Sequence, residues 1–173
     1  MTHTLIASLA IAALSTLGDV IWAMWLPEHR AVYGLAHGLL LFCAIGLVLG
    51  ALAGRPAPGA VSGAAIGAAA AGGFYVLSPF LGFSAMFPVW FGAWMALGWT
   101  YARLSAGGAS ASVVLARGAL AATASGLAFY LIAGIWMPFD PEGWDYAVHF
   151  AAWTFAYFPG FAALLNGRST VRG

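Results

Sequence analysis

The sequence predicts an all-α polytopic membrane protein in which six transmembrane helices form three hairpins. Three observations support this fold class: the composition, six apolar runs that are long enough to span a membrane, and prolines where alternate runs end. Hydrophobic residues make up 63% of the 173 residues and charged residues 6%, and the mean hydropathy is +0.93. Soluble globular domains do not have this composition, and the length fits one domain. We therefore treat residues 1–173 as a single transmembrane domain.

The six apolar runs are the predicted spans. They cover residues 4–25, 31–53, 59–79, 85–102, 117–137 and 145–166. A helix needs about 20 residues to cross the hydrocarbon, and backbone groups in lipid must bond within their own segment, so these runs are expected to be helices. Pro27, Pro79 and Pro138 stand at or just after the first, third and fifth runs, where proline cannot extend a helix. Each odd-numbered helix and its successor should then form a hairpin.

The arginines, which are the only basic residues apart from histidine, predict the orientation. Five of them fall on the side that carries both termini, and Arg30 alone falls on the other. The five are Arg55, Arg103, Arg117, Arg168 and Arg172. The positive-inside rule places that side, and both termini, in the cytoplasm. The composition, rich in Gly and Ala and free of lysine, suggests a bacterial source and hence the inner membrane. The first run lacks a basic leader and a clear cleavage site, so a retained helix is expected.

Glycines recur at every fourth residue on both sides of the turn Arg55-Pro56-Ala57-Pro58. They are Gly46, Gly50 and Gly54 before it and Gly59, Gly63 and Gly67 after it. A strip of small residues lets two backbones approach closely, which holds helices together in lipid. Residues 34–73 are therefore predicted to form a tightly packed hairpin of the glycine-zipper kind. The same strips could serve contacts between chains, so a homo-oligomer stays open.

Asp19 is the one acidic residue well inside a predicted span, where an unpaired carboxylate is costly. His37 and His149 are expected at a similar depth, and an Asp19–His37 hydrogen bond, joined by Ser15, would offset that cost. Simple pairing of this kind is one interpretation. Alternatively, His37 and His149 could hold a haem b iron between them, or the two histidines and the carboxylate could bind a non-haem metal. The cluster could also be the polar end of a pocket for a small amphipathic molecule.

Aromatic residues inside the spans favour the pocket. They are Trp22, Phe74, Tyr75, Trp90, Trp94, Phe129, Tyr130 and Trp153. Large rings cannot pack as closely as glycine, so the helices that carry them are expected to splay and leave a cavity toward the outer leaflet or midplane. A well-filled aromatic core is the alternative. The predicted ligand-binding residues are Asp19, Trp22, His37, Tyr75, Trp90, Trp94, Tyr130, His149 and Trp153.

The motifs of most enzymes are missing from the sequence. There is no nucleophile motif, no phosphate-binding loop and no pair of intramembrane carboxylates, so catalysis is not expected. Cys43 is the only cysteine, which excludes a disulfide within the chain. The leading hypothesis is a non-enzymatic protein that binds a membrane lipid and no nucleic acid. The alternatives are a small b-type haem protein and a proton-coupled transporter of a small solute that uses Asp19.

Three short segments resemble the Insig (insulin-induced gene) family of sterol-regulating membrane proteins. They are Trp25-Leu26-Pro27, Leu97-Gly98-Trp99-Thr100-Tyr101-Ala102-Arg103, and Pro141-Glu142 leading through the sixth helix to Asn166-Gly167-Arg168. The resemblance implies a pocket among six helices for a sterol or another neutral lipid such as diacylglycerol, and regulation through partner membrane proteins. Two features depart from the family: Ala102 replaces an acidic residue, and residues 80–87 are uncharged. The family's own partners are therefore not expected, and in a bacterium a glycerolipid fits better than a sterol.

Overall fold

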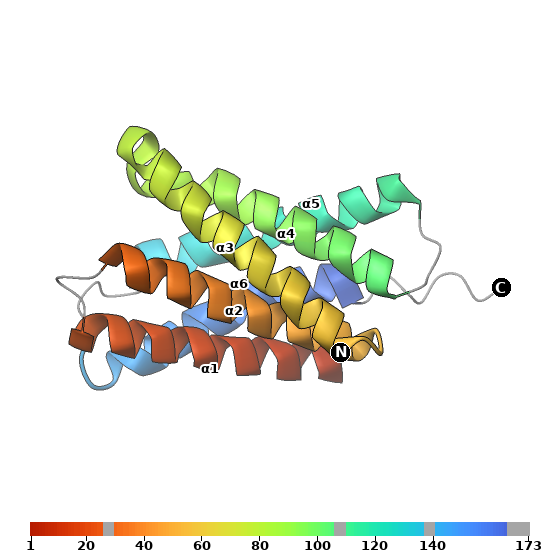
Figure 1. Cartoon of the computed structure of the whole chain (residues 1–173). Coiled ribbons are helices and arrows are strands. Elements are labelled where there is room, and N and C mark those ends of the chain that lie inside the picture. The colour runs from red at the N-terminus through yellow and green to blue at the C-terminus, as the bar shows by residue number, and fades with distance from the viewer. Residues whose placement is uncertain (26–29, 106–109, 137–140, 166–173) are drawn as a thin grey trace.

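The computed structural model describes residues 1–25, 30–105, 110–136 and 141–165, and within these ranges its regular structure is entirely helical (Figure 1). The elements are α1 (Thr2–Trp25), α2 (Arg30–Leu52), α3 (Pro56–Leu81), the short 3-10 helix η1 (Gly82–Ala85), α4 (Met86–Leu104), α5 (Ala111–Trp136) and α6 (Asp145–Leu165). The predicted all-α class with six long helices is confirmed for this part of the chain.

Five of the described helices are long and apolar enough to cross a membrane. They are α1, α2, α3, α5 and α6. The sixth, α4, has 19 residues and carries Trp90, Trp94, Trp99 and Arg103, which make it less apolar than the others. Large apolar side chains are exposed on the outer surface, among them Val61 on α3, Leu120 on α5 and Phe155 on α6. Such a surface suits hydrocarbon better than water.

The helices close into a ring, because each packs on its neighbours in the chain and α1 also packs on α6. The contact between α1 and α2 is small, whereas α1 lies along α6 for much of its length (Figure 1). Of the three predicted hairpins, α1 with α2 therefore has the smallest contact, and α1 packs mainly on α6. The physical reason is that α1 turns a buried polar face, with Thr4, Ser8 and Ser15, into the bundle, and Ser15 finds its partner on α6.

The largest helix contact joins α2 and α3, and it is made by backbone against backbone. A Cβ added at Gly46 would lie 2.8 Å from the Cα of Gly63, and one added at Gly50 would lie 2.9 Å from the Cα of Gly59. The predicted close packing along these glycines is confirmed, and we call this α2–α3 contact the glycine clamp. Gly38 extends it, since a Cβ there would lie 2.9 Å from that of Ala71.

Local signals explain where α3 begins and ends. Gly54 does not belong to the clamp as predicted: its φ of 76° serves the turn, and a Cβ there would meet nothing within 4 Å. At the other end α3 continues past Pro79 to Leu81, although it was predicted to stop at the proline. Pro79 cannot donate to the carbonyl of Tyr75, and the Ser78 hydroxyl, 3.5 Å from that oxygen, replaces the missing donor. Pro27 and Pro138 lie outside the described residues.

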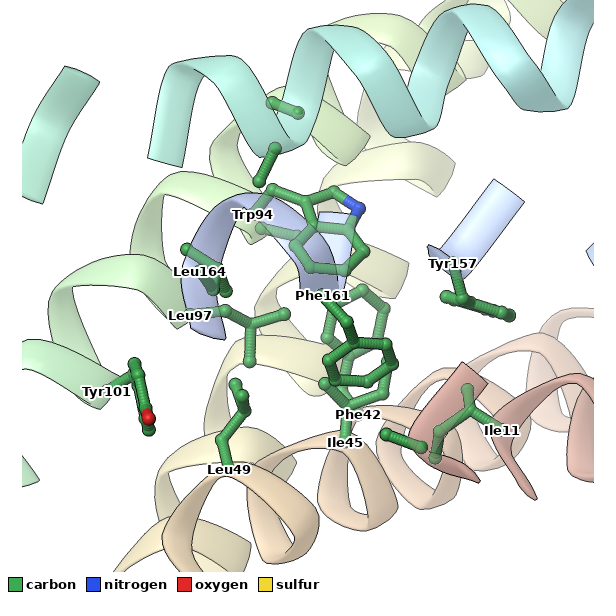
Figure 2. Close-up of a cluster of buried hydrophobic side chains, with 14 of the residues drawn as sticks. Ile11, Phe42, Ile45, Leu49, Trp94, Leu97, Tyr101, Tyr157, Phe161 and Leu164 are labelled. Atoms are coloured by element: carbon green, nitrogen blue, oxygen red, sulfur yellow. The ribbon is translucent and has the colours of Figure 1, made fainter. Parts of the chain in front are cut away.

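A tightly packed aromatic and aliphatic core fills one part of the bundle interior. Figure 2 shows Trp94 of α4, Phe161 of α6 and Ile45 of α2 meeting there. Trp94 and Phe161 pack edge to face with ring centroids 5.9 Å apart, and Trp94 is 1% exposed. A Cβ at Gly160 would come within 2.6 Å of the Trp94 ring, so this glycine provides the room for the indole. The filled core that was the alternative to a cavity therefore exists, but it occupies only part of the interior.

Candidate functional site

A cavity of about 240 Å³ lies between α2, α3, α4 and α6. Its lining residues are Gly34, His37, Gly38, Leu41, Phe42, Gly67, Ala70, Ala71, Phe74, Tyr75, Met86, Val89, Trp90, Ala93, Trp153 and Tyr157. The first turns of α2 and α4 and the last turns of α3 contribute to it, so it lies in the half of the bundle opposite the Arg55 turn. The sequence predicts a cavity in this half of the bundle, which is farther from the Arg55 turn than the closest glycine contacts between α2 and α3. Among the described residues, no arginine, aspartate or glutamate lines it.

His37 is the most polar group in the cavity wall. Its ring stacks on that of Tyr33, with centroids 5.6 Å apart, and packs against Gly18, where a Cβ would lie 2.5 Å from Nδ1. The Tyr33 hydroxyl donates to the Gly18 carbonyl and so ties α2 to α1 at this point. Within the described ranges, the imidazole of His37 makes no hydrogen bond to the protein. A neutral imidazole offers one donor and one acceptor, which remain open to a bound molecule.

Asp19 pairs with α6, and the predicted bond to His37 is wrong. Its Oδ2 atom accepts a hydrogen bond from Nε1 of Trp153 at 2.6 Å and lies 2.8 Å from Nδ1 of His149. Trp153 and His149 are about one helical turn apart, so both face the same point on α1. The side chain of His149 is 5% exposed and that of Asp19 is 23% exposed. The N–H donor of Trp153 and the hydrogen bond with the His149 ring on the same carboxyl oxygen offset much of the cost of burying the acid.

One turn from Asp19, Ser15 makes a second bond to α6. Its hydroxyl is 3.0 Å from that of Tyr157, and both residues are fully buried. We call Ser15, Asp19, His149, Trp153 and Tyr157 the α1–α6 seam. Trp153 and Tyr157 also line the cavity and stack on each other with centroids 5.8 Å apart. The hydrogen bonds of the seam therefore hold in place two of the side chains that form the α6 wall of the cavity.

Eight of the nine predicted ligand-binding residues have described side chains, and these eight fall into three groups. Four of them, His37, Tyr75, Trp90 and Trp153, line the cavity, and two, Asp19 and His149, lie in the seam beside it. Trp94 is in the filled core (Figure 2), and Tyr130 stacks on Phe87 at the α4–α5 contact, so neither lines the cavity. The side chain of Trp22 lies outside the described part of the structure.

Tyr157 is the seam residue that sequence reasoning missed. Its signal was present: Trp153 and Tyr157 are four residues apart on α6, and Ser15 and Asp19 are four apart on α1. Residues four apart lie on the same face of a helix, so these two pairs can face each other and form two hydrogen bonds between the helices. The small lining residues, such as Gly34 and Ala71, gave no signal, because alanine and glycine are abundant throughout the chain.

The two histidines do not face one another across the cavity. His37 lines it, whereas His149 is turned toward Asp19 in the seam. Among the described residues, no group of three or more His, Cys, Asp or Glu side chains is arranged to hold a metal ion. The predicted alternatives of a haem between His37 and His149, or of a metal on the two histidines and Asp19, therefore gain no support from this geometry.

Comparison with protein-family models, with curated proteins and with solved structures finds no match to this chain. The function of the chain is therefore inferred from the chemistry of the cavity wall, the volume of the cavity, and the helices and the seam that surround it.

Proposed function

We propose that the chain is an integral membrane protein of six spanning helices that binds a neutral amphipathic lipid in its cavity. Its role is sensing or regulation through other membrane proteins, and its location is the bacterial inner membrane. The observation that supports this proposal is the imidazole of His37, which faces an otherwise mainly apolar space and, among the described residues, has no hydrogen-bond partner. An apolar space with a few polar groups is the usual form of a small-molecule site.

The placement of charge supports the proposed topology. Arg55 follows α2 and Arg103 lies in the last turn of α4, so both are at the end of the bundle where α1 begins (Figure 1). Positive charge at this end favours a cytoplasmic location for it. The cavity then lies in the half of the membrane nearer the outer face.

The wall favours an uncharged head group. A phosphate or a carboxylate would have no counterion there, because no described cation lines the cavity. The one described acidic side chain close to the wall, Asp19, is hydrogen-bonded to the cavity residue Trp153 and would disfavour a second negative charge. A hydroxyl or an ester carbonyl could bond to His37. The volume of about 240 Å³ is below the roughly 300–1,000 Å³ of sites for drug-sized ligands. A glycerol-based lipid with a slender chain therefore fits better than a sterol, and it agrees with the neutral-lipid class that the Insig resemblance implies.

Filling the cavity is the first test. We expect native mass spectrometry of the purified protein to show a bound neutral lipid, and we expect Val89→Trp to abolish its retention, because Val89 lines the cavity. The matched control is Val76→Trp on α3, since Val76 is 67% exposed on the outer surface and should retain the lipid. A folded Val89→Trp variant that keeps its lipid would contradict the proposed site.

Removing the polar anchor is the second test. His37→Phe keeps an aromatic ring but loses a hydrogen bond worth about 1 kcal/mol, so we expect about fivefold weaker binding of a sixteen-carbon monoacylglycerol. The measurement is a native mass spectrometry titration, with His3→Phe, at an exposed position, as the control. Unchanged affinity in the His37 variant would show that His37 does not form a hydrogen bond with the bound lipid. An absorption spectrum of the same sample tests the haem alternative, which requires a Soret band that either histidine substitution removes.

A further inference from the structure

A second space, a groove between α3 and α4 on the exterior of the helix bundle, adjoins the cavity. It has a volume of about 440 Å³ and is lined by Ala65, Ile66, Ala69, Ala70, Pro88, Val89, Gly92, Ala93 and Ala96. None of these side chains is polar. Three of them, Ala70, Val89 and Ala93, also line the cavity, so the two spaces share a wall.

The groove exists because the facing turns of α3 and α4 carry small side chains. Ala65 and Ala69 lie one turn apart on α3, and Gly92 and Ala96 lie one turn apart on α4. Side chains that end at Cβ leave a channel between two helices that larger residues would fill. Large apolar side chains are also exposed elsewhere on these two helices, such as Val76 on α3 and Phe91 on α4.

We propose that this groove holds an acyl chain of the same lipid whose polar end lies at His37. This inference rests on the proposed function. The cavity alone is small for a whole lipid, the groove has nearly twice its volume, and the two meet at Ala70, Val89 and Ala93. In this proposal the shared wall parts at these three residues and lets the chain pass between α3 and α4, and an entirely apolar lining suits hydrocarbon alone. The ligand class is thus a neutral lipid with a flexible chain, and the ligand reaches the site sideways from the bilayer.

The test is photolabelling of the full chain in nanodiscs. The probe is a sixteen-carbon monoacylglycerol with a diazirine at the far end of its chain. We expect the label on residues 65–70 and 88–96, and we expect excess unlabelled monoacylglycerol to remove it. Ala69→Trp should reduce this labelling at least about fivefold, because Ala69 lines the groove and not the cavity. Ala68→Trp is the control, since Ala68 is exposed and lines neither space.

The outcomes separate this inference from the proposed function. Native mass spectrometry shows whether the probe is retained. If it is retained but the label spreads evenly over exposed surfaces, or if Ala69→Trp leaves the labelling unchanged, the groove assignment is overturned and the cavity stands. If the wild-type protein retains no probe, both proposals are overturned. Labelling of the groove that both the competitor and Ala69→Trp reduce supports the assignment.

Discussion

Asp19→Ala is expected to lower the free energy of unfolding by about 3 kcal/mol. The change leaves Nε1 of Trp153 and Nδ1 of His149 without their shared acceptor at a largely buried position, and a buried donor without a partner costs about 1–3 kcal/mol. The measurement is unfolding by SDS in mixed micelles, followed by tryptophan fluorescence and circular dichroism.

Asp19→Asn is the matched control for that prediction. Its amide oxygen can still accept one ring N–H, so its loss of stability should be less than half that of the alanine variant. Equal losses in the two variants would show that the ion, and not the hydrogen bonds, holds the seam together. No loss in either variant would contradict the role given to Asp19 in joining α1 to α6.

Gly46→Ala is expected to destabilise the protein by about 2 kcal/mol, because overpacking of a closely packed contact costs about 1–3 kcal/mol. The new methyl group would meet the backbone of Gly59 and Gly63, and backbone cannot move aside as a flexible side chain can. The α2–α3 contact would have to widen along its length. The same SDS titration measures the effect.

Gly72→Ala is the control for the clamp, because nothing lies within 4 Å of a Cβ at that position. Alanine is a better helix former than glycine by about 1 kcal/mol, so this variant should be as stable as the wild type or more stable. Opposite signs for the two changes would identify close packing as the cause. A similar loss in both would instead show that any change to α3 or its partner is harmful.

The helices and the clamp could be predicted from the sequence, because both depend on periodic patterns along the chain. The glycines at every fourth residue lie on one face of each helix whatever the rest of the fold does, so Gly46 and Gly63 had to be near one another once α2 and α3 formed a hairpin. The end of α3 was harder to predict. It depended on one hydroxyl, that of Ser78, compensating for Pro79.

The partner of Asp19 could not be predicted, because depth in the membrane says nothing about direction around a helix. His37 and His149 were both at a suitable depth, and the choice followed from the packing of α1 on α6. Trp90 and Trp94 show the same limit. They are one turn apart on α4, yet Trp90 lines the cavity and Trp94 fills the core, since Gly160 leaves space for the Trp94 ring.

The backbone contact between α2 and α3 also determines which parts of the bundle are free to move. Two helices packed largely backbone against backbone have little room to slide or to separate, so they form a stiff wall on one side of the cavity. Any expansion that admits a larger guest must come from α4 and α6, and α6 is hydrogen-bonded to α1. A displacement of α6 at the cavity wall would then also move α1, because the hydrogen bonds of the seam join the two helices.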